Sequence, residues 1–153
     1  MSIDDRLAEL GIELLPPSPP AGAYVAAVRT GNLVFCSGQG PARPDGSFVT
    51  GKVGTDIDLA TAVDAARLTG IQLLGALKAE IGDLDKVTRV VKVLGMVNGA
   101  PGFNNTPAVI DGCSMLFVEV FGEAGRGARS AVGMAELPFD ISVEIEAIFE
   151  VAD

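Results

Sequence analysis

Histidine and tryptophan are absent from this chain of 153 residues, and cysteine occurs only twice. Without histidine no Cys–His nucleophile pair can form, so neither cysteine is a candidate for that kind of catalysis. Cys36 and Cys113 lie far apart in apolar sequence, which predicts two buried free thiols in a reducing compartment. The lack of histidine and of closely spaced cysteines also argues against zinc, so we expect no bound metal.

Positive charge is scarce as well. Lysine and arginine together number 11 against 20 aspartates and glutamates, which gives a net charge of −9. Nucleic-acid-binding proteins usually carry clustered basic residues, and this sequence has no such cluster, so we expect no nucleic-acid partner. The acidic start of the chain is unlike a signal peptide, and no apolar run approaches the ~18 residues of a membrane span. These features predict a cytoplasmic protein with no membrane partner.

Apolar residues, by contrast, make up 48% of the chain. The length fits one domain with a substantial core, and the apolar fraction exceeds what a polar monomer needs. We therefore expect self-association to cover part of the surface. Residues 1–20 are interpreted as a short helix capped by Ser2 and a proline-rich extension, and residues 21–153 as a single domain.

The first half of this domain predicts a β-hairpin followed by a long helix. Two short β segments at 24–29 and 33–37 flank a tight turn, and a weaker strand is expected around 48–49. Apolar residues then recur at steps of three and four, which predicts a helix from about Asp56 to Ile81 capped by Thr55.

The second half adds strands and one more helix. The β-branched run at 87–97 predicts a central strand, and Thr106-Pro107 predicts the start of a helix that ends at Gly122. The whole pattern indicates an α+β fold, a mixed β-sheet with two helices packed on one face. No segment remains to cover the other face, which again favours partner subunits.

The last part of the chain combines an arginine with a row of glutamates. A tight turn at Pro138 predicts a hairpin in which Arg129 lies opposite Ile148 and Glu144 lies opposite Gly133. Four residues of strand, at ~3.3 Å each, would then separate Arg129 from Glu144 by ~13 Å. Within one subunit the pair would not touch, so either a ligand spans the gap or a neighbouring subunit supplies one of the two.

Two separated motifs resemble signatures of the RidA/YjgF family, which is also labelled endoribonuclease L-PSP. The first is G-N-L-V-F-C-S-G-Q at 31–39, and the second combines A-R-S-A-V at 128–132, L-P at 137–138 and V-E-I-E-A at 143–147. The resemblance implies a chorismate-mutase-like fold and a homotrimer with ligand clefts between subunits. It also implies hydrolysis of enamines and imines to 2-keto acids and ammonia, as in a 2-iminobutanoate/2-iminopropanoate deaminase, without metal or organic cofactor.

The resemblance assigns roles to four residues. Arg129 matches the family arginine that grips the substrate carboxylate, a task suited to a guanidinium with two parallel donors. Glu144 matches the glutamate that positions or activates water as a general acid–base. Tyr24 and Ser37 match a tyrosine and a serine of the ligand cleft. On the residues alone, two solvated charges, a packing tyrosine and a serine that satisfies the backbone are equally consistent with the sequence.

Several departures from the family pattern indicate a divergent branch. Ala131 stands where the family often has cysteine, and a cleft asparagine on the second helix has only Asp111 or Asn105 as its nearest candidates. The extension through Pro20 and the loop at 95–105 also look longer than in compact members. The alternative hypothesis is therefore a non-catalytic module that binds small carboxylates in the same clefts.

Overall fold

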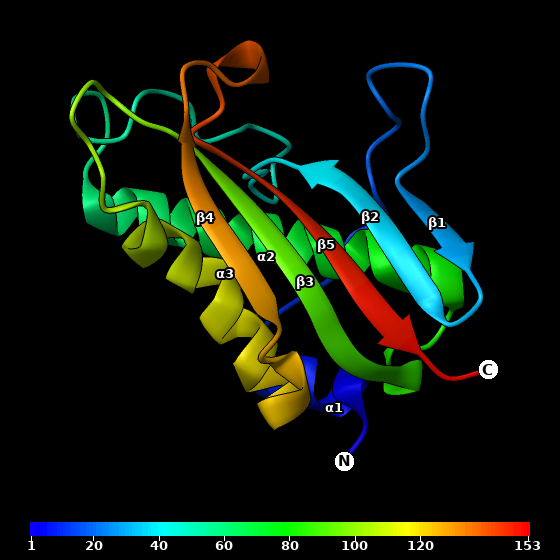
Figure 1. The fold of residues 1–153 in the computed structure, drawn as a ribbon. Helices are drawn as coiled ribbons and strands as arrows, with labels where there is room; N and C mark the ends of the chain where they lie inside the picture. Colours follow the sequence, from blue (N-terminus) through cyan, green and yellow to red (C-terminus); the bar gives the residue numbers. More distant parts are fainter.

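The computed structural model describes residues 1–153 and shows one five-stranded sheet with the long helices packed on one face (Figure 1). This is the α+β architecture expected from the sequence. Three short 3₁₀ segments lie between the main elements, at Leu84–Lys86, Gly122–Gly125 and Pro138–Asp140. The main elements are, in chain order, α1 (Ile3–Glu9), β1 (Ala27–Thr30), β2 (Leu33–Gln39), α2 (Leu59–Ile81), β3 (Val87–Asn98), α3 (Thr106–Phe121), β4 (Ala128–Met134) and β5 (Val143–Val151).

Helix α2 starts a few residues later than predicted, whereas α3 begins at Thr106 and ends before Gly122 as predicted. Helix α2 begins at Leu59 because the Asp58 carboxylate accepts a hydrogen bond from the Thr61 N–H at 2.8 Å, so Thr55 is not the cap. Thr106 does not cap α3 either, since its hydroxyl donates to the Ala131 carbonyl of β4 at 3.0 Å. The cap of α1 is as predicted, with Ser2 in a capping box.

The strand order is β1-β2-β5-β3-β4, and only β3 and β4 run parallel. The predicted hairpin of the last two strands is therefore wrong, because β3 lies between them (Figure 1). Arg129 pairs with Val93 of β3, while Ile148 lies opposite Phe35 and Lys92. The β3–α3–β4 crossover places β4 at the sheet edge, and β5 then returns to the middle. The segment at 48–49 forms only isolated bridges, not a strand.

The core lies between the sheet and the two long helices. Strand β5 alternates buried and partly exposed residues, as predicted for a strand with one face on the core. Cys36 and Cys113 are both buried free thiols, which confirms their prediction. The helices approach closely at Gly70 and Gly112, where an added methyl group would strike the facing helix. The helix layer covers one face of the sheet. The chain leaves the opposite, outer face of the sheet uncovered (Figure 1).

The N-terminal segment packs on this same core. Leu7 of α1 is buried, and the following residues run along α2 so closely that a methyl group on Gly75 would lie 2.5 Å from the Leu15 carbonyl oxygen. The proline-rich stretch 16–20 then leads to β1. This path brings residues 18–21 beside the open end of β2, where the site described next is found.

Candidate functional site

A bulge in β2 shapes the first part of the candidate site. The pairing of β2 with β5 shifts between Cys36 and Gln39, so Ser37 and Gly38 have no direct partner in β5. Glu144 of β5 lies directly over Gly38, where an added Cβ would be 2.5 Å from its carboxylate oxygen. Glycine at this place in the S-G-Q motif therefore makes room for the glutamate.

A cavity of about 680 Å³ opens beside this bulge, and we call it the Glu144 cavity. Its floor is the backbone of Gly38 to Gly40, with Phe48 and Ile141 packed over Gly40. Residues 18–21 close one side, and the turn at Pro138–Phe139 closes another. Glu144 is the only aspartate, glutamate, lysine or arginine that lines the cavity.

The surroundings of Glu144 raise the pKa of its carboxyl group. Burial in the cavity wall raises the pKa of the Glu144 carboxyl, and the nearby charge of Glu146 raises it further. No hydrogen bond or cation of the chain counters these two effects. A carboxyl group whose pKa is moved toward neutrality is suited to exchange a proton with a substrate or a water molecule.

Tyr24 and Ser37 lie near the cavity but in different roles. Tyr24 lines it, with a half-exposed ring and a hydroxyl that accepts a hydrogen bond from the Ala21 N–H at 3.3 Å. Ser37 does not line it, because its hydroxyl donates to the Val25 carbonyl at 2.6 Å. Ser37 thus holds the segment that carries Tyr24, and its contact with a ligand stays a prediction.

Arg129 lies in a second, separate depression of about 230 Å³, which we call the Arg129 hollow. Its Nη1 donates to the Asp111 carboxylate at 2.6 Å and to the Ser114 hydroxyl at 3.2 Å, and both partners belong to α3. The side chain retains 25% of its exposure. Because Nε and Nη2 make no bond within the chain, the guanidinium keeps two donors for a carboxylate.

The two hollows do not meet within one chain. Arg129 pairs through Val93 with Ala147, so two strand spacings of ~4.8 Å and three residues of ~3.3 Å put the Arg129 and Glu144 Cα atoms roughly 14 Å apart. They also point to opposite faces, since Arg129 contacts α3 and Glu144 alternates with buried residues of β5. The hairpin register was wrong, but the predicted lack of contact within one subunit is correct.

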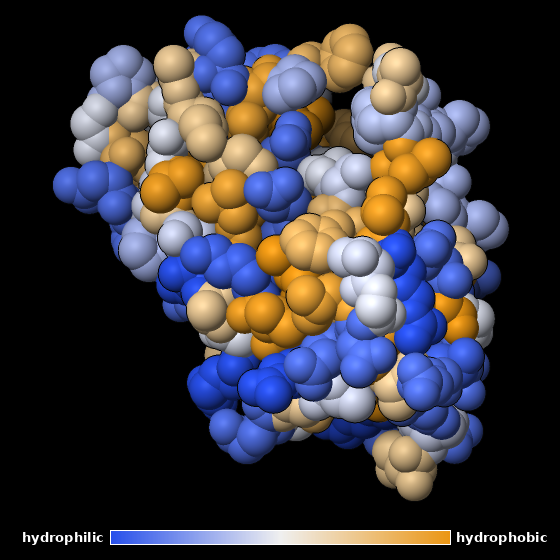
Figure 2. Space-filling view, turned by 45° about the vertical axis from the view of Figure 1, so that its right-hand side comes forward, coloured by the Kyte–Doolittle hydropathy of each residue, from blue (hydrophilic) through white to orange (hydrophobic).

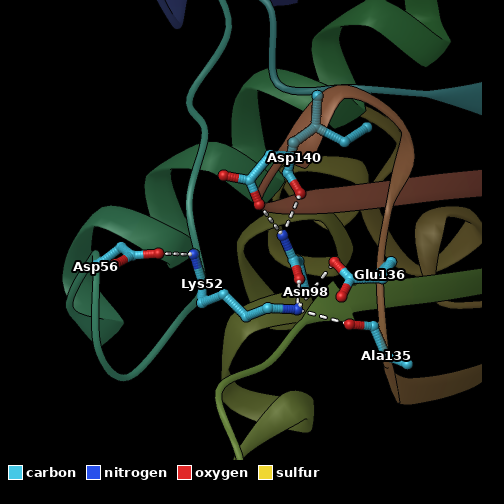
Figure 3. Close-up of polar contacts among 7 residues, drawn as sticks. Lys52, Asp56, Asn98, Ala135, Glu136 and Asp140 are labelled. Carbon is cyan, nitrogen blue, oxygen red and sulfur yellow. Dashed lines mark hydrogen bonds and ion pairs between the residues drawn. The ribbon is translucent and has the colours of Figure 1, made fainter.

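A polar network that the sequence did not predict fixes the turn beside the Glu144 cavity (Figure 3). The Lys52 ammonium donates to the Asn98 side-chain oxygen at 2.7 Å and to the Ala135 carbonyl at 2.6 Å. The fully buried Asn98 amide donates in turn to Asp140 at 2.9 Å and to the Ile141 carbonyl at 3.1 Å. Three segments far apart in sequence are thereby joined behind the cavity wall.

This network holds a strained turn. Phe139 and Asp140 have φ angles of 56° and 57°, a left-handed conformation that costs non-glycine residues roughly 1–2 kcal/mol each. The turn nevertheless presents Phe139 with 85% of its side chain exposed at the mouth of the cavity. A strained, exposed aromatic at such a place is a candidate for contact with a ligand or a partner.

The outer sheet face carries exposed apolar side chains. Val28 and Phe35 face each other across β1 and β2, and Phe35 lies opposite Ile148 of β5. Figure 2 shows hydrophobic surface gathered in the middle of one face of the molecule between bands of hydrophilic residues. No helix of the structure is both long and apolar enough to cross a membrane.

Comparisons with known proteins give the family. Residues 4–149 match the family described as "YjgF/chorismate_mutase-like, putative endoribonuclease". The chain therefore belongs to the YjgF/RidA family, as its two motifs predicted.

Three relatives show how widely this likeness extends. Protein TCP17 of Trypanosoma cruzi is 41% identical over 95% of this chain and 91% of its own length. The 2-iminobutanoate/2-iminopropanoate deaminase of Escherichia coli K12 is 34% identical over 83% of this chain and 86% of its own. The crystal structure of Atu1372 from Agrobacterium tumefaciens, a protein of unknown function, has a TM-score of 0.90 at 47% identity, covering 99% of this chain and 94% of that one.

Proposed function

We propose that the protein hydrolyses imines of 2-amino acids to 2-keto acids and ammonia, in clefts between the subunits of a homotrimer. The observation that carries this proposal is a carboxyl group of raised pKa, Glu144, in a cavity without cations. The name of the E. coli relative supports the same reaction. A net charge of −9 gives no support to an action on RNA.

The chemistry follows from the charges of the substrate. A protonated imine carries a positive charge beside its carboxylate, and the Glu144 carboxylate attracts that cation while orienting a water molecule toward the imine carbon. The water gives a proton to the Glu144 carboxylate as the C–O bond forms. Glu144 returns this proton to the nitrogen, and the C–N bond breaks as the C=O bond forms, with the hydroxyl proton leaving on the nitrogen. One iminium zwitterion and one water give one 2-keto acid anion and one ammonium ion, so protons and charge balance.

Arg129 supplies the complementary half of the site. Its free donors suit the substrate carboxylate. In the same chain, however, the Arg129 and Glu144 Cα atoms lie roughly 14 Å apart and the two side chains point to opposite faces of the sheet. The carboxylate and imine carbon of the substrate are bonded neighbours, so both groups act on one molecule only if different subunits contribute them. The uncovered apolar sheet face supports such an assembly.

Mixed trimers test this arrangement directly. Arg129→Ala and Glu144→Gln are each expected to be inactive alone. Co-expressed with different tags and purified as hybrids, they should regain activity, because one subunit offers an intact Glu144 cavity and its neighbour an intact Arg129 hollow. Random assembly restores about one quarter of the sites, since each site needs two independent one-in-two choices.

Controls make the outcome decisive. Arg89→Ala removes an exposed arginine outside both hollows, whose partner is Glu150, and should leave activity unchanged. Hybrids that stay inactive, although both variants fold and assemble, would show that one chain supplies both groups. A monomer by sedimentation would contradict the shared cleft in the same way.

A non-catalytic binding module is the second candidate. The Arg129–Asp111 ion pair of 2.6 Å favours it, because Asp111 already occupies one edge of the guanidinium. Thermal-shift measurements with pyruvate and longer 2-keto acids would show binding that requires Arg129. Binding of this kind without turnover of any imine would favour the module over the hydrolase.

A further inference from the structure

The Glu144 cavity is larger than a small imino acid requires. The imine of alanine has six non-hydrogen atoms, and even at ~30 Å³ per atom, the volume of a water molecule in the liquid, it fills at most about 180 Å³. The cavity measures about 680 Å³. In the proposed assembly, part of the excess space accommodates the neighbouring subunit, and the rest is available to water or to another part of the ligand.

The walls of that space include aromatic and apolar side chains beside the polar Gln39, Thr50 and Gln72. Phe48 and Ile141 lie over Gly40, two residues further along the chain than Gly38, where Glu144 sits. At ~3.3 Å per residue the acidic and apolar ends of the cavity are therefore about 7 Å apart. Phe139 and Tyr24 add two further rings that are exposed enough to contact a ligand. A substrate whose side group extends beyond its imine carbon would therefore reach from the acidic end toward the apolar end.

The charge of the cavity points the same way. An anionic group would find no lysine or arginine there, so the substrate carboxylate does not belong inside it. A cationic imine beside Glu144 and an uncharged side group beyond it match the lining. The carboxylate is left for Arg129 of a neighbouring subunit, as in the proposed function.

The aromatic wall is built to stay in place. The Lys52–Asn98–Asp140 network fixes the turn that presents Phe139 (Figure 3). On the other side, residues 18–21 form a wall rich in proline, and proline holds an extended chain with little freedom. The N-terminal extension thus acquires a role as one side of the binding cavity.

We infer that the protein acts on imines of amino acids with aromatic side chains, and that Phe48, Phe139 and residues 18–21 select them. The inference deepens the proposed function and rests on it for the reaction. Binding of the side group, however, depends on the cavity alone.

Competition kinetics provide the first arm of the test. An amino-acid oxidase generates imines from L-phenylalanine or L-alanine, and semicarbazide traps whatever the protein does not hydrolyse. The kcat/KM for the phenylalanine imine should exceed that for the alanine imine by at least about tenfold, as expected for filling an apolar pocket. Phe139→Ala and Phe48→Ala should each reduce this ratio several-fold.

A matched variant and a binding arm separate the possible failures. Leu59→Ala removes an exposed apolar side chain outside both hollows and should keep the ratio. Calorimetry with phenylpyruvate and pyruvate needs no turnover, and phenylpyruvate should bind at least about tenfold more tightly.

The outcomes are distinguishable. Equal or faster hydrolysis of the alanine imine would overturn the aromatic selectivity and leave the hydrolase intact. Tighter binding of phenylpyruvate, weakened by Phe139→Ala but without turnover of either imine, would overturn the hydrolase and keep the selectivity. Equal binding of both keto acids together with no turnover would overturn both.

Discussion

The Glu144 cavity and the Arg129 hollow lie on opposite sides of the same sheet and differ in size and charge. The first measures about 680 Å³, is walled by rings and prolines and contains one acid of raised pKa. The second measures about 230 Å³ and contains two arginines and an aspartate. The first suits a cationic or apolar group and the second an anion. Each hollow thus resembles half of a site for a zwitterion.

Replacement of Arg129 should show the difference between the two hollows most clearly. Arg129→Ala is expected to lower kcat/KM for any 2-imino acid by about 10²–10³-fold, because the substrate carboxylate loses a charge-assisted, bidentate partner. Arg129→Lys should recover only part of this loss, since an ammonium lacks the fork geometry. Steady-state kinetics measure the effect, and a thermal melt checks that loss of the Asp111 contact leaves the fold intact. Wild-type kinetics for Arg129→Ala would remove the Arg129 hollow from the site.

A substitution at Gly38, which lies beneath Glu144, should affect only the Glu144 cavity. Gly38→Ala places a methyl group 2.5 Å from the Glu144 carboxylate, which must swing away from the floor. We expect kcat to fall by about 10–100-fold, less than the full value of a general acid–base, with little loss of stability. Gly133→Ala in β4 is the matched control, because its methyl group would meet nothing closer than 3.9 Å. Equal activity of the two variants would contradict the placement of Glu144.

The polar network behind the cavity should have a moderate effect. Lys52→Met leaves the buried Asn98 oxygen without a donor, which is expected to lower the free energy of unfolding by about 1–3 kcal/mol. Lys78→Met, which breaks only the exposed pair with Asp4, should cost less than about 1 kcal/mol. Urea unfolding compares the two. If Lys52 positions the Phe139 turn, Lys52→Met should also lower the ratio of kcat/KM for the phenylalanine imine to that for the alanine imine. Lys78→Met should leave this ratio unchanged.

The pH dependence should give the smallest effect. Because the pKa of Glu144 is raised, the carboxylate that orients water is lost as pH falls through that raised value, and kcat/KM should fall with it. Glu146→Gln removes a neighbouring negative charge, so the acidic limb of the pH–rate profile should move to lower pH. An unchanged limb would show that another group governs it.

The same raised pKa affects stability with the opposite trend. The folded chain holds the proton of Glu144 more tightly than the unfolded chain does, so this group's contribution to stability is complete below the unfolded pKa and decreases as pH rises through the folded pKa. Glu144→Gln should therefore raise the melting temperature slightly at pH 8 and not at pH 4. Thermal melts at the two pH values measure the difference.

Much of the fold follows from local patterns in the sequence. The alternation along 143–151 and the stripe along 59–81 were sufficient to place the helices on one face, and the two motifs, which contain Ser37, Arg129 and Glu144, identified the family. The wrong hairpin shows where such patterns fail. A turn at Pro138 is compatible with a hairpin locally, but Asn98, forty residues away, binds the backbone at 141 and draws the connection across the end of β3.

The site was also only partly predictable, because local patterns do not show which residues far apart in the sequence come together. Arg129 and Glu144 belong to motifs, whereas Lys52 is a single charged residue in a loop and carries no periodic or spacing signal. Its partners come from the end of β3 and from the segment before β5, and only the folded chain brings them together. The aromatic wall likewise joins residues 18–21 to Phe48 and Phe139.

The place of β5 in the sheet has a consequence for how the chain matures. This strand joins the β1–β2 ladder to the β3–β4 ladder, so neither half of the sheet is connected to the other before β5 arrives. It is also the strand that the ribosome makes last among these residues. While it is missing, the inner faces of both ladders and of α2 are exposed to solvent and to other nascent chains. The acid of the proposed site and the closure of the sheet thus appear together, in the same nine residues.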